Sequence, residues 1–143
     1  MKISTRGRYA LRVMIDMAEH YGGEYIPLKD VADRQGISQK YLESITADLS
    51  KAGVLEGQHG KGGGYKLKRE PESYTVGEIL RITEGDLAPV TCLEKSAKAC
   101  SFSGDCRTLS MWKDFYALIN DFFDGITVSS LMKKRTDGND YVI

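Results

Sequence analysis

The chain has 143 residues and a mass of 15.9 kDa, enough for one domain with some additional structure. Its composition, 41% hydrophobic and 28% charged with only 3 prolines, favours a folded core and excludes global disorder. The 20 basic and 20 acidic residues cancel, so net charge does not indicate a nucleic-acid partner. No apolar run reaches the roughly 20 residues of a membrane span, and the basic opening lacks an apolar signal core. We therefore expect a cytoplasmic protein with no membrane partner.

The first part of the chain carries the pattern of a helix-turn-helix. Apolar residues three and four apart predict a first helix over residues 5–21 and a short second helix over 28–34. Gly36 is suited to the left-handed end of the second helix. Ser38 is a good N-cap for a third helix that ends at Gly53. A short helix, a tight glycine turn and a capped helix together indicate a helix-turn-helix.

A β-hairpin is predicted directly after these helices. Two β-prone segments, 54–58 and 65–68, flank a glycine-rich tip. A capping box of Thr75 and Glu78 then starts a further short helix. The predicted fold class is mainly α with a small β-hairpin, a winged helix-turn-helix DNA-binding domain that occupies residues 1–85, followed by a long C-terminal dimerisation helix.

The longest helical pattern runs from residue 106 to 124 and carries two neighbouring apolar stripes. The first stripe consists of Leu109, Trp112, Tyr116, Ile119 and Phe123, and the second of Met111, Phe115, Leu118 and Phe122. This apolar arc is too wide for a helix on one surface, so we expect a second copy of the chain to cover part of it. The predicted interface contains the whole first stripe together with Phe115 and Phe122.

A single-chain core helix with exposed aromatics is the alternative to a dimer. We assign residues 107–143 to this dimerisation helix and the C-terminal tail. A last short helix is expected from Thr127 to Lys134, followed by a polar tail that frays over 137–140.

The outward face of the third helix carries polar residues suited to base edges in the major groove. Gln39 can read adenine, Lys40 can reach guanine or phosphate, and Glu43 can accept from cytosine. Taken alone, this face is equally well a solvated surface, but basic residues of the first helix and the wing lie where phosphate backbones would run. The predicted DNA-binding residues are Arg6, Arg8, Ser38, Gln39, Lys40, Tyr41, Glu43, Ser44, His59, Lys61, Lys66 and Lys68.

Three cysteines lie in the aperiodic segment 86–106, which we treat as a sensor loop. Cys92, Cys100 and Cys106 follow the spacing C-x7-C-x5-C, and three thiolates can close around one soft metal centre. Iron–sulfur clusters and structural zinc both favour four ligands, so the fourth is a non-cysteine group, external or absent. The spacing alone leaves three free thiols as an equal alternative.

An enzymatic function is not expected. No nucleophile is accompanied by a base in a recognisable arrangement, and the acidic residues are scattered. The glycine-rich segment 60–64 lacks the following helix and the Lys-Ser/Thr pair of a phosphate-binding loop.

Five segments occur together in a recognisable order. They are MKISTRGRYAL, QKYLESI, GKGGGYKL, TVGEILRITEG and the cysteine loop followed by Trp112. The combination resembles the family of bacterial winged-helix transcription regulators that contains IscR, NsrR and CymR, over nearly the whole chain. The resemblance implies a homodimer on palindromic operators, usually a repressor, with the long helix in the interface. It also implies an iron–sulfur cluster of unassigned nuclearity, held by Cys92, Cys100 and Cys106.

The chain departs from the patterns of the individual family members. Leu109 stands where IscR-like members have a histidine ligand, and Arg8 stands where NsrR-like members have an aspartate. Asp105, Ser110, a partner-chain carboxylate or a small thiol therefore remain open as the fourth ligand. His59 replaces a wing arginine of IscR-like members, and CymR-like members lack the cysteines.

The expected function is a transcription regulator that senses iron–sulfur, redox or nitric oxide status. One alternative is a metal-free regulator of the same fold that responds to thiol chemistry or a small molecule. Another is a winged-helix module that docks proteins.

Overall fold

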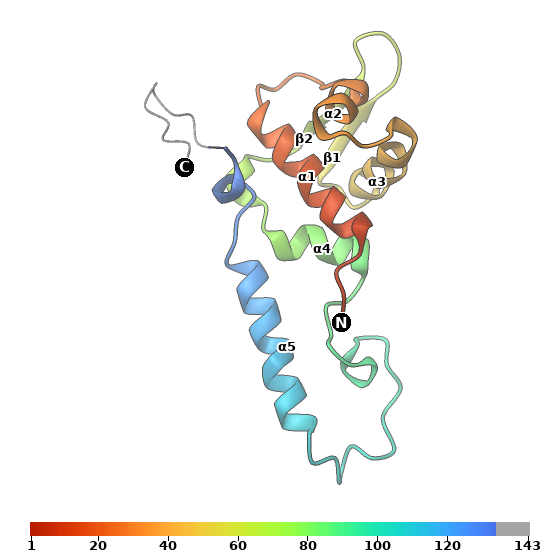
Figure 1. The fold of residues 1–143 in the computed structure, drawn as a ribbon, viewed down its shortest axis with the longest axis vertical. Coiled ribbons are helices and arrows are strands. Elements are labelled where there is room, and N and C mark those ends of the chain that lie inside the picture. The colour runs from red at the N-terminus through yellow and green to blue at the C-terminus, as the bar shows by residue number, and fades with distance from the viewer. Residues whose placement is uncertain (134–143) are drawn as a thin grey trace.

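The computed structural model describes residues 1–133. Its helices are α1 (Thr5–Glu19), α2 (Leu28–Gln35), α3 (Gln39–Lys51), α4 (Val76–Glu84) and α5 (Leu109–Asp124); its strands are β1 (Leu55–Gln58) and β2 (Gly64–Leu67). Short 3-10 turns cover Pro71–Ser73, Thr91–Leu93 and Ser129–Leu131. In Figure 1, α1 to α3 and the hairpin gather at one end of an elongated molecule, while α5 and the preceding loop extend from the other end. The predicted fold class is confirmed.

Side-chain caps define the helix-turn-helix as the sequence predicts. Ser38 accepts a hydrogen bond from the Tyr41 backbone N–H at 3.2 Å and starts α3. Gly36 ends α2 in the left-handed conformation, with φ of 64°. Because only two residues separate this glycine from the start of α3, the two helices meet in a tight turn.

The main core lies between α1, α2, α3 and the hairpin. Tyr74, which is fully buried, ties the hairpin to this core through its hydroxyl. That hydroxyl donates to the Val54 carbonyl at 2.9 Å and accepts from the backbone N–H groups of Lys68 and Arg69 at 3.1 and 2.9 Å. The wing is therefore anchored at both of its ends by a single side chain.

The hairpin pairs β1 with β2 antiparallel, with Leu55 opposite Leu67. Its second strand also pairs with Ile26 in the chain before α2. At Gly64 the backbone has φ of 146°, and an added Cβ would overlap the Ile26 carbonyl oxygen. At Gly63 an added Cβ would overlap the Gln58 carbonyl oxygen. Glycine at these two positions allows the close backbone approach that closes the wing.

Helix α5 joins the body through its C-terminal half. A second apolar cluster contains Val76 and Leu80 of α4 together with Ile119 of α5. Arg81 of α4 adds an ion pair to Asp124, at 2.8 Å. The N-terminal turns of α5 extend away from α4 beside the long loop (Figure 1).

Two predicted boundaries are wrong. The long helix begins at Leu109 rather than at residue 106, because the residues just before it form turns without a side-chain cap. The predicted helix from Thr127 is a single 3-10 turn at Ser129–Leu131. Lys134 and the polar tail lie outside the described residues. Within residues 1–133, no helix is long and apolar enough to cross a membrane.

Candidate nucleic-acid interface and cysteine loop

The N-terminal face of α3 is open to solvent, as a recognition helix requires. Leu42, Ile45 and Leu49 are fully buried on the opposite face and fix the helix to the core. Tyr41 is half-buried and packs edge-to-face on Tyr9, with ring centroids 5.7 Å apart. The exposed polar residues on this face are Ser38, Gln39, Lys40, Glu43 and Ser44.

Arg6 holds α3 against the start of α1. Its guanidinium donates to the Ser44 hydroxyl and to the Ser44 backbone carbonyl, both at 3.0 Å, and forms an ion pair with Asp48. Arg6 therefore positions the recognition helix, a role that the sequence analysis missed. Arg8 is exposed and donates to the Thr5 hydroxyl at 2.9 Å.

A buried carboxylate joins α1 to α2. Asp16 is 2% exposed and accepts hydrogen bonds from Arg34 at 2.7 Å and from Gln35 at 2.9 Å. The hydrogen bond to Asp16 raises the pKa of Arg34, which stays charged. Because α2 leads directly into α3 at Gly36, this pair also fixes the direction of the recognition helix.

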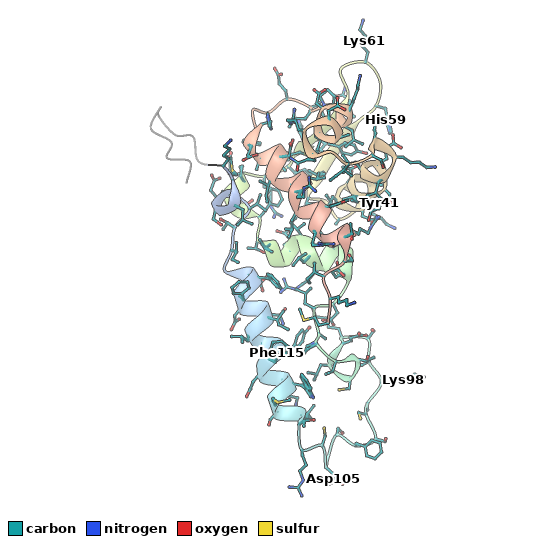
Figure 2. The ribbon with its side chains drawn as sticks, in the orientation of Figure 1. Tyr41, His59, Lys61, Lys98, Asp105 and Phe115 are labelled. Atoms are coloured by element: carbon teal, nitrogen blue, oxygen red, sulfur yellow. The ribbon has the colours of Figure 1, made fainter. Side chains whose placement is uncertain are left out.

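The wing presents exposed residues at its tip and a braced stem. Figure 2 shows Lys61 at the outermost point of the hairpin. His59 and Lys68 are exposed as well. Lys66, in contrast, lies 4.6 Å from the centre of the Tyr25 ring and 3.9 Å from Glu56. The structure thus assigns Lys66 a bracing contact in the stem, which the sequence analysis did not foresee.

The cysteine loop lies at the end of the molecule opposite to the wing, where Figure 2 labels Lys98 and Asp105. Cys92, Cys100 and Cys106 are exposed free thiols that line one hollow of about 220 Å³. Within residues 1–133, no three His, Cys, Asp or Glu side chains are arranged to hold a metal ion. The donor chemistry suits an iron–sulfur cluster, but the loop must close further before three sulfurs reach one centre.

Only some of the residues at the positions considered for a fourth ligand line this hollow. Leu109, which replaces the histidine of IscR-like members, lines it, as does Ser103. Asp105 and Ser110 are not among its lining residues.

The Cys106 thiol has a pKa lowered from its ordinary value. The cause is hydrogen bonding, first from the Thr108 hydroxyl at 3.6 Å and then from backbone N–H groups of Thr108 and Leu109. The Thr108 hydroxyl is the larger cause and the backbone N–H groups at the start of α5 are the smaller one. Cys106 therefore has an increased thiolate fraction at neutral pH.

The two apolar stripes of α5 have different environments. The first stripe faces its own chain: Ile119 is buried, Phe123 packs on the second cluster and Tyr116 donates a hydrogen bond to Asp86. The residues of the second stripe are exposed to solvent, with fractional exposures of 51% for Met111, 40% for Phe115, 65% for Leu118 and 62% for Phe122. Of the predicted interface residues, Phe115 and Phe122 lie on the exposed stripe, while Ile119 and Tyr116 are engaged within the chain.

The chain is similar to known proteins over most of its length. The model of the Rrf2 family, described as an iron-dependent transcriptional regulator, matches residues 3–134. The chain belongs to the Rrf2 family. It is 36% identical to the HTH-type transcriptional regulator IscR of Vibrio campbellii, over 93% of this chain and 78% of that protein.

Solved structures of other Rrf2-type regulators agree with the fold. The structure of CymR, the global cysteine regulator of B. subtilis, matches with a TM-score of 0.75 and 32% identity over 92% of this chain and 95% of that chain. The structure of T. potens IscR matches with a TM-score of 0.68 and 36% identity over 94% and 93% of the two chains.

The Rrf2 protein is accordingly a helix-turn-helix transcription regulator and not an enzyme. The winged-helix resemblance inferred from the sequence is confirmed. The individual DNA-contacting residues, the three cysteine ligands and the segment limits 1–85, 86–106 and 107–143 stay predictions.

Proposed function

We propose that this Rrf2 protein acts as a homodimer that binds a palindromic operator, as a repressor, and senses iron–sulfur, redox or nitric oxide status through its cysteine loop. The observation that carries the proposal is the position of the three-thiol hollow at the N-terminal end of α5, the helix whose second stripe is exposed. A change in the loop can thereby act on the helix that pairs the two protomers. We place its action in the cytoplasm, where bacterial operators lie.

The proposed DNA contacts come from α3 and from the tip and the base of the wing. The exposed N-terminal residues of α3 enter the major groove, and Lys61 and Lys68 meet the phosphate backbones. In a dimer, two recognition helices meet half-sites about one helical turn, roughly 34 Å, apart. Arg6 and Asp16 keep α3 in a fixed orientation for this contact.

DNA binding is tested by titrating genomic fragments at several salt concentrations. Lys40→Ala and Lys68→Ala should weaken binding and lower the slope of affinity against salt by about one each, because each lysine neutralises one phosphate. Lys133→Ala is the matched control, since this exposed lysine lies beyond α5, where its backbone N–H donates to Glu19. Unchanged binding in both α3 and wing variants would contradict this placement on DNA.

In the proposed sensor, Cys92, Cys100 and Cys106 hold an iron–sulfur cluster. The cluster supplies redox- and nitric-oxide-sensitive chemistry when it is bound. The lowered pKa of Cys106 favours the thiolate that such ligation requires. The similarity to two IscR proteins and the iron-dependent description of the family support this part of the proposal.

The sensor is tested by metal and sulfide analysis of protein purified without oxygen. Reconstituted protein should show visible charge-transfer absorption that Cys92→Ala abolishes. Ser101→Ala, at a loop residue that does not line the hollow, should keep the absorption. A colourless protein with full operator binding would reject the cluster.

A metal-free thiol switch is the second candidate. It is favoured by the exposure of all three cysteines and by the lowered pKa of Cys106. Operator binding that changes with peroxide while iron is absent would support it over the cluster.

A further inference from the structure

Asp86 connects three parts of the molecule through one carboxylate. It lies two residues beyond the end of α4 and accepts a hydrogen bond from the Tyr116 hydroxyl of α5 at 2.6 Å. The same carboxylate accepts the backbone N–H of Ala88 at 2.9 Å and that of Lys95 at 2.8 Å. The end of α4, the first part of the cysteine loop and α5 therefore meet at a single side chain.

The protonation states of Asp86 and Tyr116 favour a stable hydrogen bond between them. The pKa of Asp86 lies below its ordinary value. Partial burial acts to raise this pKa, but the hydrogen bonds from Tyr116 and from two backbone N–H groups together lower it by more. The hydrogen bond to Asp86 raises the pKa of Tyr116 in turn. At neutral pH the acceptor is ionised and the phenol keeps its proton, so the bond is charge-assisted.

The hydrogen bonds of Asp86 enclose one cysteine and leave the other two outside. Cys92 lies between Ala88 and Lys95, the two residues whose N–H groups the carboxylate binds. Cys100 and Cys106 follow beyond this closed segment. A conformational change at Cys92 therefore acts directly on the hydrogen bonds of Asp86.

The segment that carries Asp86 also contacts the helix-turn-helix. Glu84, two residues earlier, accepts hydrogen bonds from the backbone N–H and the hydroxyl of Ser4, the N-cap of α1. The fit is close, because a Cβ at Gly7 would overlap the Glu84 carboxylate. Two residues after Ser4, Arg6 binds Ser44 of the recognition helix.

We propose that Asp86 is the positioning residue that couples the conformation of the closed segment around Cys92 to helix α5. A regulatory role for this coupling rests on the proposed sensor function of the cysteine loop. Movement of the segment breaks the Tyr116–Asp86 bond and loosens the turns of α5 around Tyr116. Glu84, two residues before Asp86, also joins the end of α4 to the start of α1 through Ser4.

The test measures hydrogen exchange in α5 of the reduced, metal-free full chain. One variant keeps Cys92 as its single cysteine, another keeps Cys100, and each is compared with and without a bulky maleimide label. Labelling at Cys92 should speed exchange in the turns around Tyr116 by at least about tenfold, the lower limit for losing a charge-assisted hydrogen bond. Labelling at Cys100 should change it less than about twofold, because this thiol lies outside the closed segment.

The effect of the label should vanish in Tyr116→Phe, which removes only the hydroxyl, and should be smaller in Asp86→Asn, whose amide oxygen still accepts but carries no charge. Tyr21→Phe, which removes a hydroxyl that contacts Glu70 and not Asp86, should respond like the parent chain. An unchanged α5 after labelling of Cys92, or an equal response in Tyr116→Phe, would overturn the proposal. Because neither cluster nor DNA takes part, that outcome is separate from a failed reconstitution or a failed operator titration.

Discussion

Leu118→Ala tests whether the exposed stripe of α5 pairs two protomers. Full burial of a leucine side chain stabilises an assembly by about 1.5–3 kcal/mol. Leu118 is 65% exposed, and a two-fold interface contains it twice. Allowing for the methyl group that alanine keeps, the substitution should cost about 2–3 kcal/mol per dimer. The dimer Kd should therefore rise roughly 30- to 150-fold.

Sedimentation equilibrium over a range of protein concentrations measures this Kd directly. The variant protomer should keep its own stability within about 0.5 kcal/mol, because the side chain is exposed within one chain. Leu131→Ala is the control, at a 45% exposed leucine outside α5, and should leave the Kd unchanged. A Leu118→Ala dimer as tight as the wild type, or a wild type that stays monomeric while operator binding saturates, would refute the pairing.

Two further predictions follow from single hydroxyl groups. Tyr74→Phe should lower the free energy of unfolding by about 2–3 kcal/mol, because the Val54 carbonyl loses its donor and two wing N–H groups lose their acceptor. Urea unfolding measures this difference, with Tyr21→Phe as the control. Equal unfolding midpoints for Tyr74→Phe and the wild type would contradict the prediction. Thr108→Val should move the pH–rate curve for alkylation of Cys106 in metal-free protein to higher pH, because the lost hydrogen bond no longer favours the thiolate. Mass spectrometry follows the rate of alkylation. Coincident curves for the variant and the wild type would contradict the role of the Thr108 hydroxyl.

Local sequence rules were sufficient for the helix-turn-helix. Ser38 and Thr75 cap their helices by accepting an N–H three residues later, and Gly36 ends α2 by its own backbone conformation. Each rule involves neighbours within one helical turn, so a single sequence contains all the information. Where no such rule applies, at the residues just before α5, the predicted boundary is wrong.

Long-range contacts decided what the sequence left open. The basic charge of Arg6 suggests a phosphate contact, but its partners lie 38 and 42 residues away on α3. The pattern of α5 contains both apolar stripes, yet only the position of α4 determines that Ile119 faces inward and Leu118 outward. Asp86 follows a helix-ending glycine and has no pattern that predicts Tyr116 as its partner.

The two closely packed glycines of the wing limit how its proposed contacts with DNA can change during evolution. A larger residue at Gly63 or Gly64 collides with a main-chain oxygen and dismantles the hairpin instead of altering its contacts. His59 and Lys61 are exposed and can be exchanged without this penalty. The strength of the proposed wing contact with DNA can therefore change through one or two side chains at the hairpin tip while the hairpin itself stays intact.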